Sequence, residues 1–273
     1  MLGHHFRALG PAAILALTAG LAGCPANVDG QVDEQSVDAL LSALFVQDQD
    51  DFGESDTMYT LNATGVSVLG ACDQGTKYQQ AYNDLLQTNL EDVKDADGDV
   101  GKLDDANEAF AQGVVDYEVK NFPTDLWRVS ASLQTLDDGN FDGADQDIDL
   151  EDPDDSSIDP TDDNDLVANL TICRVNDHPK VDEPEDHQFV VDRDQDCYVA
   201  KKGSLVVNKY DEDKTFTITA EVELTALDSD GAIKDIDDDA GKVVVNINAA
   251  HCPTLEEEIQ NTQDIITDAL DGG

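Results

Sequence analysis

Strict alternation of apolar and polar residues in the C-terminal half is the feature that most constrains the fold. Within residues 215–224, apolar side chains take every second position and Thr or Glu takes the positions between them. The apolar members are Phe216, Ile218, Ala220, Val222 and Leu224. Successive side chains of a strand point to opposite faces, so this pattern predicts a strand with one face on a core and one in water. Residues 242–250 repeat the pattern, as do residues 127–133, where Trp127 takes an inward position.

Polar turns separate several more short runs of the same kind. These runs predict strands at 58–69, 166–175, 188–192, 197–201 and 204–210. In the first of these the alternation changes phase at Gly65, which indicates a β-bulge there.

Helical spacing of apolar residues occurs near the start of the chain and at its end. It predicts helices over 34–46, 78–86 and 103–117, the last two forming a hairpin around the acidic loop 95–99. A closing helix is expected from Thr254, with Glu257 as capping-box partner, burying Leu255, Ile259, Ile266 and Leu270. The fold class is therefore α+β or mainly β. We expect an antiparallel sheet or sandwich in one domain over 33–273, with helices near the start and at the C-terminus.

The first 23 residues have the three parts of an export signal. Arg7 gives a basic head, an apolar stretch follows, and small residues stand at the end. The apolar stretch is shorter than the roughly 20 residues that a membrane span needs, so we expect residues 1–23 to be removed.

The segment Leu21-Ala22-Gly23-Cys24 resembles the lipobox of bacterial lipoproteins. The resemblance implies diacylglyceryl transfer to the Cys24 thiol and cleavage before this residue. Residues 24–32 would then be a lipidated tether, and the partner would be the lipid bilayer. Two or more acyl chains anchor stably, at about 0.8 kcal/mol per buried methylene. The resemblance implies a location in the bacterial cell envelope, with the outer membrane expected.

The chain carries 61 acidic and 15 basic residues, a formal net charge of −46. Nucleic acid and anionic lipid headgroups would repel it, so neither is an expected partner. Adaptation to salty surroundings and the binding of divalent cations both explain such a charge, and composition does not separate them.

Five cysteines are present, and lipidation of Cys24 would leave four. In an exported chain, four cysteines favour two disulfides over a metal site, and no Cys-x-x-Cys spacing argues otherwise. Among three pairings we favour Cys173 with Cys197, on neighbouring strands, and Cys72 with Cys252.

The acidic loop 137–165 contains an EF-hand-like spacing. The residues at loop positions 1, 3, 5, 7 and 12 are Asp138, Asn140, Asp142, Ala144 and Asp149, with Gly143 at the turn position. Carboxylates, an amide and a backbone carbonyl at these positions would surround one calcium ion. The alternative is a solvated acidic linker.

Common enzyme signatures are absent from the sequence, including the nucleophile elbow, the zinc helix and the phosphate-binding glycine loop. A zinc site of His178, His187 and Asp186 is conceivable, but histidines on a solvated loop are usually not ligands. His251, next to Cys252, is interpreted as a strand-end residue. We therefore expect a membrane-anchored envelope lipoprotein with a non-enzymatic binding or structural role. The alternative is a lipid-tethered extracytoplasmic hydrolase.

Overall fold

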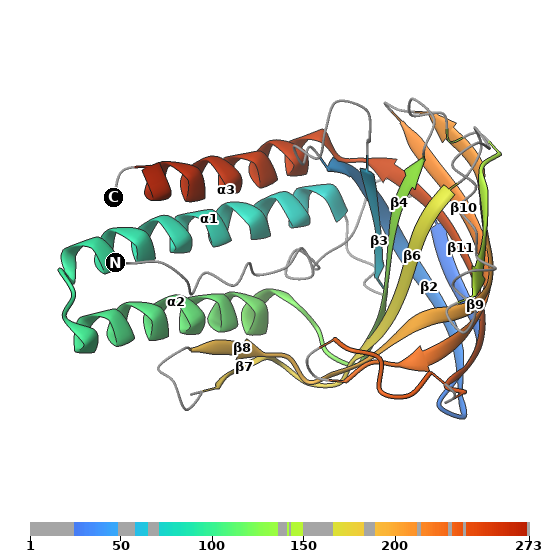
Figure 1. Ribbon diagram of the computed structural model, residues 1–273, viewed down its shortest axis with the longest axis horizontal. Coiled ribbons are helices and arrows are strands. Elements are labelled where there is room, and N and C mark those ends of the chain that lie inside the picture. Colours follow the sequence, from blue (N-terminus) through green and yellow to red (C-terminus); the bar gives the residue numbers. More distant parts are fainter. Residues whose placement is uncertain are drawn as a thin grey trace.

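The computed structural model is mostly β, with a closed antiparallel barrel and three helices that project from it (Figure 1). This confirms the predicted fold class. The structure describes residues 25–48, 58–64, 71–135, 141, 143–149, 166–182, 189–211, 214–228, 231–236 and 239–271.

Eight strands form the barrel wall. They are β1 (Pro25–Val32), β2 (Gln35–Asp48), β3 (Met58–Thr64), β4 (Leu126–Thr135), β6 (Leu166–Val175), β9 (Gln195–Asp211), β10 (Thr215–Ala226) and β11 (Gly241–His251). Each pairs antiparallel with the next strand in the order β1-β2-β3-β4-β6-β9-β10-β11, and β11 pairs again with β1. The ring is therefore closed, because each of the eight wall strands pairs with a strand on either side.

Two additions complete the sheet structure. The short strand β5 (Asp145–Asp149) pairs with β9 beside β6, where β6 and β9 diverge. A separate two-stranded ribbon, β7 (Lys180–Asp182) with β8 (Val190–Asp192), contacts the second helix.

The inward faces of the strands fill the barrel with apolar side chains. Every inward residue of the run 216–224 is at most 2% exposed, as the alternation predicts. Aromatic rings fill one end, where Phe45, Tyr59, Phe141, Tyr210 and Phe216 have ring centroids 5.1–6.0 Å apart. Trp127 is partly buried and packs against this core.

The first two strands differ from the sequence prediction. Residues 25–32, expected as a tether, form β1, and residues expected as a helix over 34–46 form β2. In β2, Val37, Leu41 and Phe45 point into the barrel. The outward Leu44 is also buried because the third helix covers it. When both faces of a strand are buried, apolar residues can occur at the three- and four-residue spacings that are typical of a helix.

The helices are α1 (Ala71–Asp95), α2 (Val100–Asn121) and α3 (Pro253–Asp271). The predicted hairpin is confirmed by α1 and α2, and Asp99 caps α2 by accepting from the backbone N of Gly101. The closing helix is confirmed, but it begins at Pro253, a favourable first helical residue. Ile266 and Leu270, expected to be buried, are 42% and 66% exposed because that half of α3 extends beyond the barrel (Figure 1).

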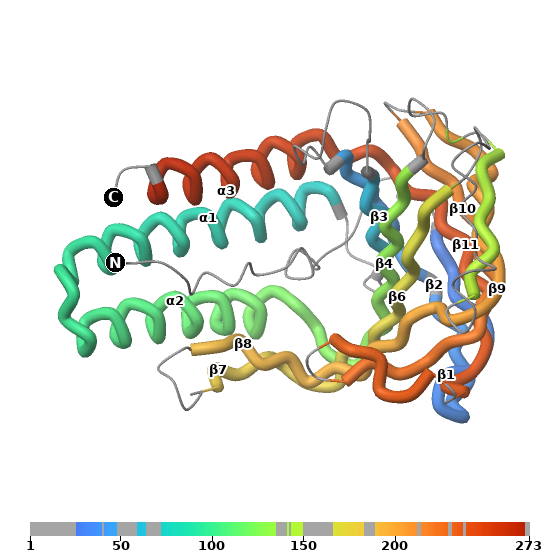
Figure 2. Tube along the Cα trace, viewed as in Figure 1, coloured from blue at the N-terminus to red at the C-terminus, as the bar shows by residue number. Residues whose placement is uncertain are grey.

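α1 lies between the other two helices (Figure 1) and contacts both. Its contacts with α3 are largely polar. Gln79 Nε2 donates to Thr262 Oγ1 over 2.7 Å, and Asn83 Nδ2 donates to the carbonyl of Glu258 over 2.9 Å. The Cα trace shows α1 and α3 reaching the barrel at neighbouring points (Figure 2), where a disulfide joins Cys72 to Cys252.

Other predicted boundaries shift by a few residues. The strand expected over 58–69 is described as β3 to Thr64, and the bulge expected at Gly65 lies outside the described residues. The runs 197–201 and 204–210 form one strand, β9. Gly203 allows the strand to continue, because its φ of +136° favours glycine and a Cβ there would lie 2.1 Å from the Glu221 carbonyl oxygen.

Candidate functional site

The candidate site is a group of buried charges between α2, the β7–β8 ribbon and the outer face of β4. Glu118 of α2 is 3% exposed, and Arg128 of β4 is 9% exposed. Arg193, just after β8, forms an ion pair with Oε1 of Glu118. Tyr78 of α1 donates its hydroxyl to the same oxygen over 2.9 Å. One carboxylate therefore joins α1, α2 and the segment after β8.

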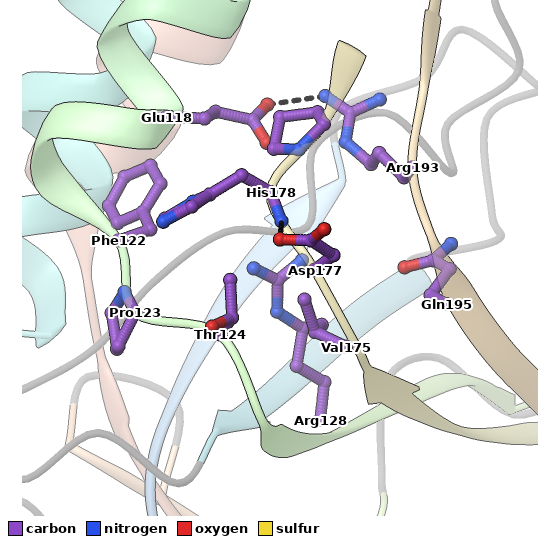
Figure 3. A pocket seen from close by; sticks show the side chains of 11 residues that line it. Glu118, Phe122, Pro123, Thr124, Arg128, Val175, Asp177, His178, Arg193 and Gln195 are labelled. Atoms are coloured by element: carbon purple, nitrogen blue, oxygen red, sulfur yellow. Dashed lines mark hydrogen bonds and ion pairs between the residues drawn. The ribbon is translucent and has the colours of Figure 1, made fainter.

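A small recess opens beside this group (Figure 3). His178 and Asp177 lie in the middle of it, with Glu118 of α2 and Phe122, the residue after this helix, on one side and Arg193 on the other. The His178 backbone N donates to Asp177 Oδ1 over 2.8 Å. The recess measures about 20 Å³, which is room for roughly one water molecule.

Burial governs the electrostatics of the group. Burial raises the pKa of the Tyr78 hydroxyl far above its ordinary value, and the Glu118 carboxylate raises this pKa further. Burial lowers the pKa of Arg128, although Glu118 opposes the shift. For Arg193, burial acts to lower the pKa, but the charge of Glu118 and its hydrogen bond outweigh it and the pKa is raised. The cluster thus stabilises a neutral Tyr78 and a charged Arg193 around one carboxylate, whereas burial disfavours the charged form of Arg128.

A larger hollow of about 630 Å³ lies on the barrel wall, across β5, β9, β10 and β11. Register places Asp149, Lys202, Glu223 and Lys242 side by side, so negative and positive charges alternate over four strands. Lys202 Nζ lies 3.0 Å from Asp149 Oδ2, and Lys242 pairs with Glu223. The four charges of this row sum to zero. The volume of the hollow is in the range of small-molecule sites.

The histidines singled out in the sequence do not converge in the described part of the chain. His178 borders the recess, whereas His251 forms a hydrogen bond between its Nε2 and Glu256 Oε1 over 3.0 Å and stacks on Phe45. His187 and Asp186 lie outside the described residues. The interpretation of His251 as a strand-end residue is confirmed, since it is the last residue of β11.

The structure keeps apart the two expected calcium ligands that lie among the described residues, Ala144 and Asp149. Ala144 directly precedes β5 and Asp149 is the last residue of this strand, and five extended residues span roughly 16 Å. Ligands of one calcium ion lie within about 5 Å of each other, because each is 2.3–2.6 Å from the ion. Asp149 instead pairs with Lys202, and the Ala144 carbonyl accepts from the Val207 backbone N over 2.8 Å. Asp138, Asn140 and Asp142 lie outside the described residues.

The physical reason is that part of this acidic loop belongs to the core. Phe141 is fully buried against Tyr59, Tyr210 and Phe216. The Gly143 backbone N donates to the Val207 carbonyl, which extends the pairing of β5 with β9. Within the described ranges, no group of three or more His, Cys, Asp or Glu side chains is arranged to hold a metal ion.

Both expected disulfides are present. Cys72 is joined to Cys252, and Cys173 of β6 is joined to Cys197 directly opposite on β9. Cys24, the lipobox and the leader lie outside the described residues. In the part of the chain that is described, no helix is long and apolar enough to cross a membrane.

Sequence reasoning missed the Glu118 cluster. A signal for it existed, because Glu118 follows Val114 by four residues and so falls on the apolar face of α2.

No family model matches the sequence, and no curated protein or solved structure shows significant similarity to it.

Proposed function

We propose that this chain is a lipoprotein of the bacterial cell envelope, anchored through acyl chains on Cys24, with a binding or structural role rather than a catalytic one. The observation that carries the proposal is the pairing of the other four cysteines in two disulfides. Disulfides persist in oxidising compartments, which supports export. The pairing also leaves Cys24, at the end of the leader, as the cysteine available to a lipid.

The non-catalytic role draws support from the contacts of the candidate catalytic groups. A hydrolase needs a cleft where a histidine and acids meet substrate. His178 borders a recess with room for roughly one water molecule, and His251 is engaged by Glu256 and Phe45. These contacts favour a structural role for both histidines over the hydrolase alternative.

Membrane fractionation tests the anchor. The wild-type chain, expressed with its own leader in a bacterial host, should sediment with membranes and be released by detergent. The Cys24→Ser variant should be soluble or remain unprocessed. Wild-type protein that stays soluble after processing would refute the proposal.

A further inference from the structure

The start of β1 determines how a lipid on Cys24 would hold the barrel. β1 begins at Pro25, and its register already pairs Pro25 with Ser42 of β2. Consecutive Cα atoms are 3.8 Å apart, so the lipid-bearing residue would be one residue away from the barrel wall. No spacer separates the anchor from the folded protein.

Pro25 lies part of the way along the wall and not at a barrel end. β2 continues for six residues past Ser42, to Asp48. Just beyond the start of β1, β11 and β2 pair directly, Ala250 with Leu44 and His251 with Phe45. At this fork β11 and β2 pair with each other, so the sheet itself has no place for a further residue before Pro25.

A lipid attached at this fork would have to lie on the outer face of the barrel. The inner face there is filled by Ala26, Phe45 and Ala249, each at most 1% exposed. On the outer face, Leu44 packs with Cys252 and Leu255 at the beginning of α3. A lipid at this point would thus lie on the outer wall, beside the base of α3.

We propose that the anchored protein lies on the bilayer by the side wall formed by β11, β1 and β2, with the opposite strand β6 facing away. This inference rests on the proposed lipidation of Cys24. The membrane partner follows from the absence of any residue between the lipidated cysteine and the first strand. A lipoprotein with a flexible spacer after its lipidated cysteine would instead sample all orientations relative to the bilayer.

Fluorescence quenching measures this orientation. A genetically encoded fluorescent amino acid is placed either at Asp29, exposed on β1, or at Asn169, exposed on β6 across the barrel. The lipidated protein is reconstituted in phosphatidylcholine vesicles that carry a nitroxide on the lipid headgroup. Quenching at position 29 should exceed that at position 169 by at least twofold.

Insertion of a 20-residue Gly-Ser spacer between Cys24 and Pro25 is the matched control. Such a spacer has a root-mean-square span of about 25 Å, and it should bring the two positions to similar, weak quenching. Equal quenching at both positions without the spacer, in protein that floats with the vesicles, overturns the side-wall orientation while lipidation stands. Protein that does not float with the vesicles refutes the lipid anchor itself, and the orientation with it.

Discussion

The hydroxyl of Tyr78 on α1 donates a hydrogen bond to Oε1 of Glu118 on α2, 2.9 Å away, and Arg193 forms its ion pair with the same oxygen. A single carboxylate thus holds two helices and the segment after β8. Because Glu118 is buried and both partners meet the same oxygen, we expect this carboxylate to contribute strongly to the packing of α1 and α2.

Replacement of Glu118 by Gln should destabilise the protein by about 3–5 kcal/mol, because removing one partner of a buried ion pair leaves the other charge uncompensated. Glu108→Gln is the matched control, since Glu108 is exposed on the same helix. Urea unfolding of both variants measures the difference. A loss for Glu118→Gln no greater than that for Glu108→Gln would contradict the structural role of the cluster.

Alkaline pH should destabilise the fold through Tyr78. Its pKa is raised in the folded state by burial and by Glu118, so above the ordinary tyrosine value near pH 10 the unfolded chain releases a proton that the folded chain retains. The free energy of unfolding is then unaffected below pH 10 and falls as pH rises beyond it.

Tyr78→Phe should make this fall shallower. Tyr82→Phe is the matched control. Tyr82 stacks on Tyr78, and its pKa is raised mainly by burial. Unfolding free energies at pH 8 to 11.5 provide the comparison. An alkaline slope left unchanged by Tyr78→Phe would assign the effect to other tyrosines, such as Tyr198, whose pKa is also raised by burial and by Asp33.

Gly203 should tolerate no side chain. A Cβ would lie 2.1 Å from the backbone oxygen of Glu221, and φ is +136°, so Gly203→Ala should cost roughly 2–5 kcal/mol. Gly98 has φ of +82° with no atom within 4 Å of a Cβ, and Gly98→Ala should cost about 1–2 kcal/mol. Thermal unfolding of both variants tests the order. Equal costs would mean that β9 can relax away from β10.

The two disulfides should differ in their contribution to stability. Cys72–Cys252 closes a separation of 180 residues and Cys173–Cys197 one of 24. In the loop-closure model these restrict the unfolded chain by about 5 and about 3.5 kcal/mol. Paired Cys→Ser variants, compared by urea unfolding, should show the larger loss for Cys72–Cys252. The opposite order would indicate that the helices and the barrel unfold separately.

The sequence predicted secondary structure best for strands that have one buried and one solvent-exposed face. The strand at 215–224 and its neighbour at 242–250 were predicted from alternation, and the helical hairpin from its 3.6-residue period. β2 was mistaken for a helix because α3 covers Leu44, which placed apolar residues on both faces. That cover depends on a contact between segments more than 200 residues apart, which local pattern does not contain.

The acidic loop illustrates the same limit. Spacing of Asp residues predicted a calcium site, but Phe141 is the only aromatic residue in 137–165, and it is buried among the rings of the barrel. A lone aromatic in a charged segment was the available signal for a core contact. The Glu118 cluster required the packing of α2 on the β7–β8 ribbon, which local pattern does not contain, although an acid on an apolar helix face pointed to it.

Mass spectrometry of the mature amino terminus tests the lipoprotein assignment most directly. We predict a terminal peptide that begins at Cys24, with a mass increased by a diacylglyceryl group, and no peptide from residues 1–23. A mature chain that begins at any other residue, or an unmodified Cys24, would contradict it.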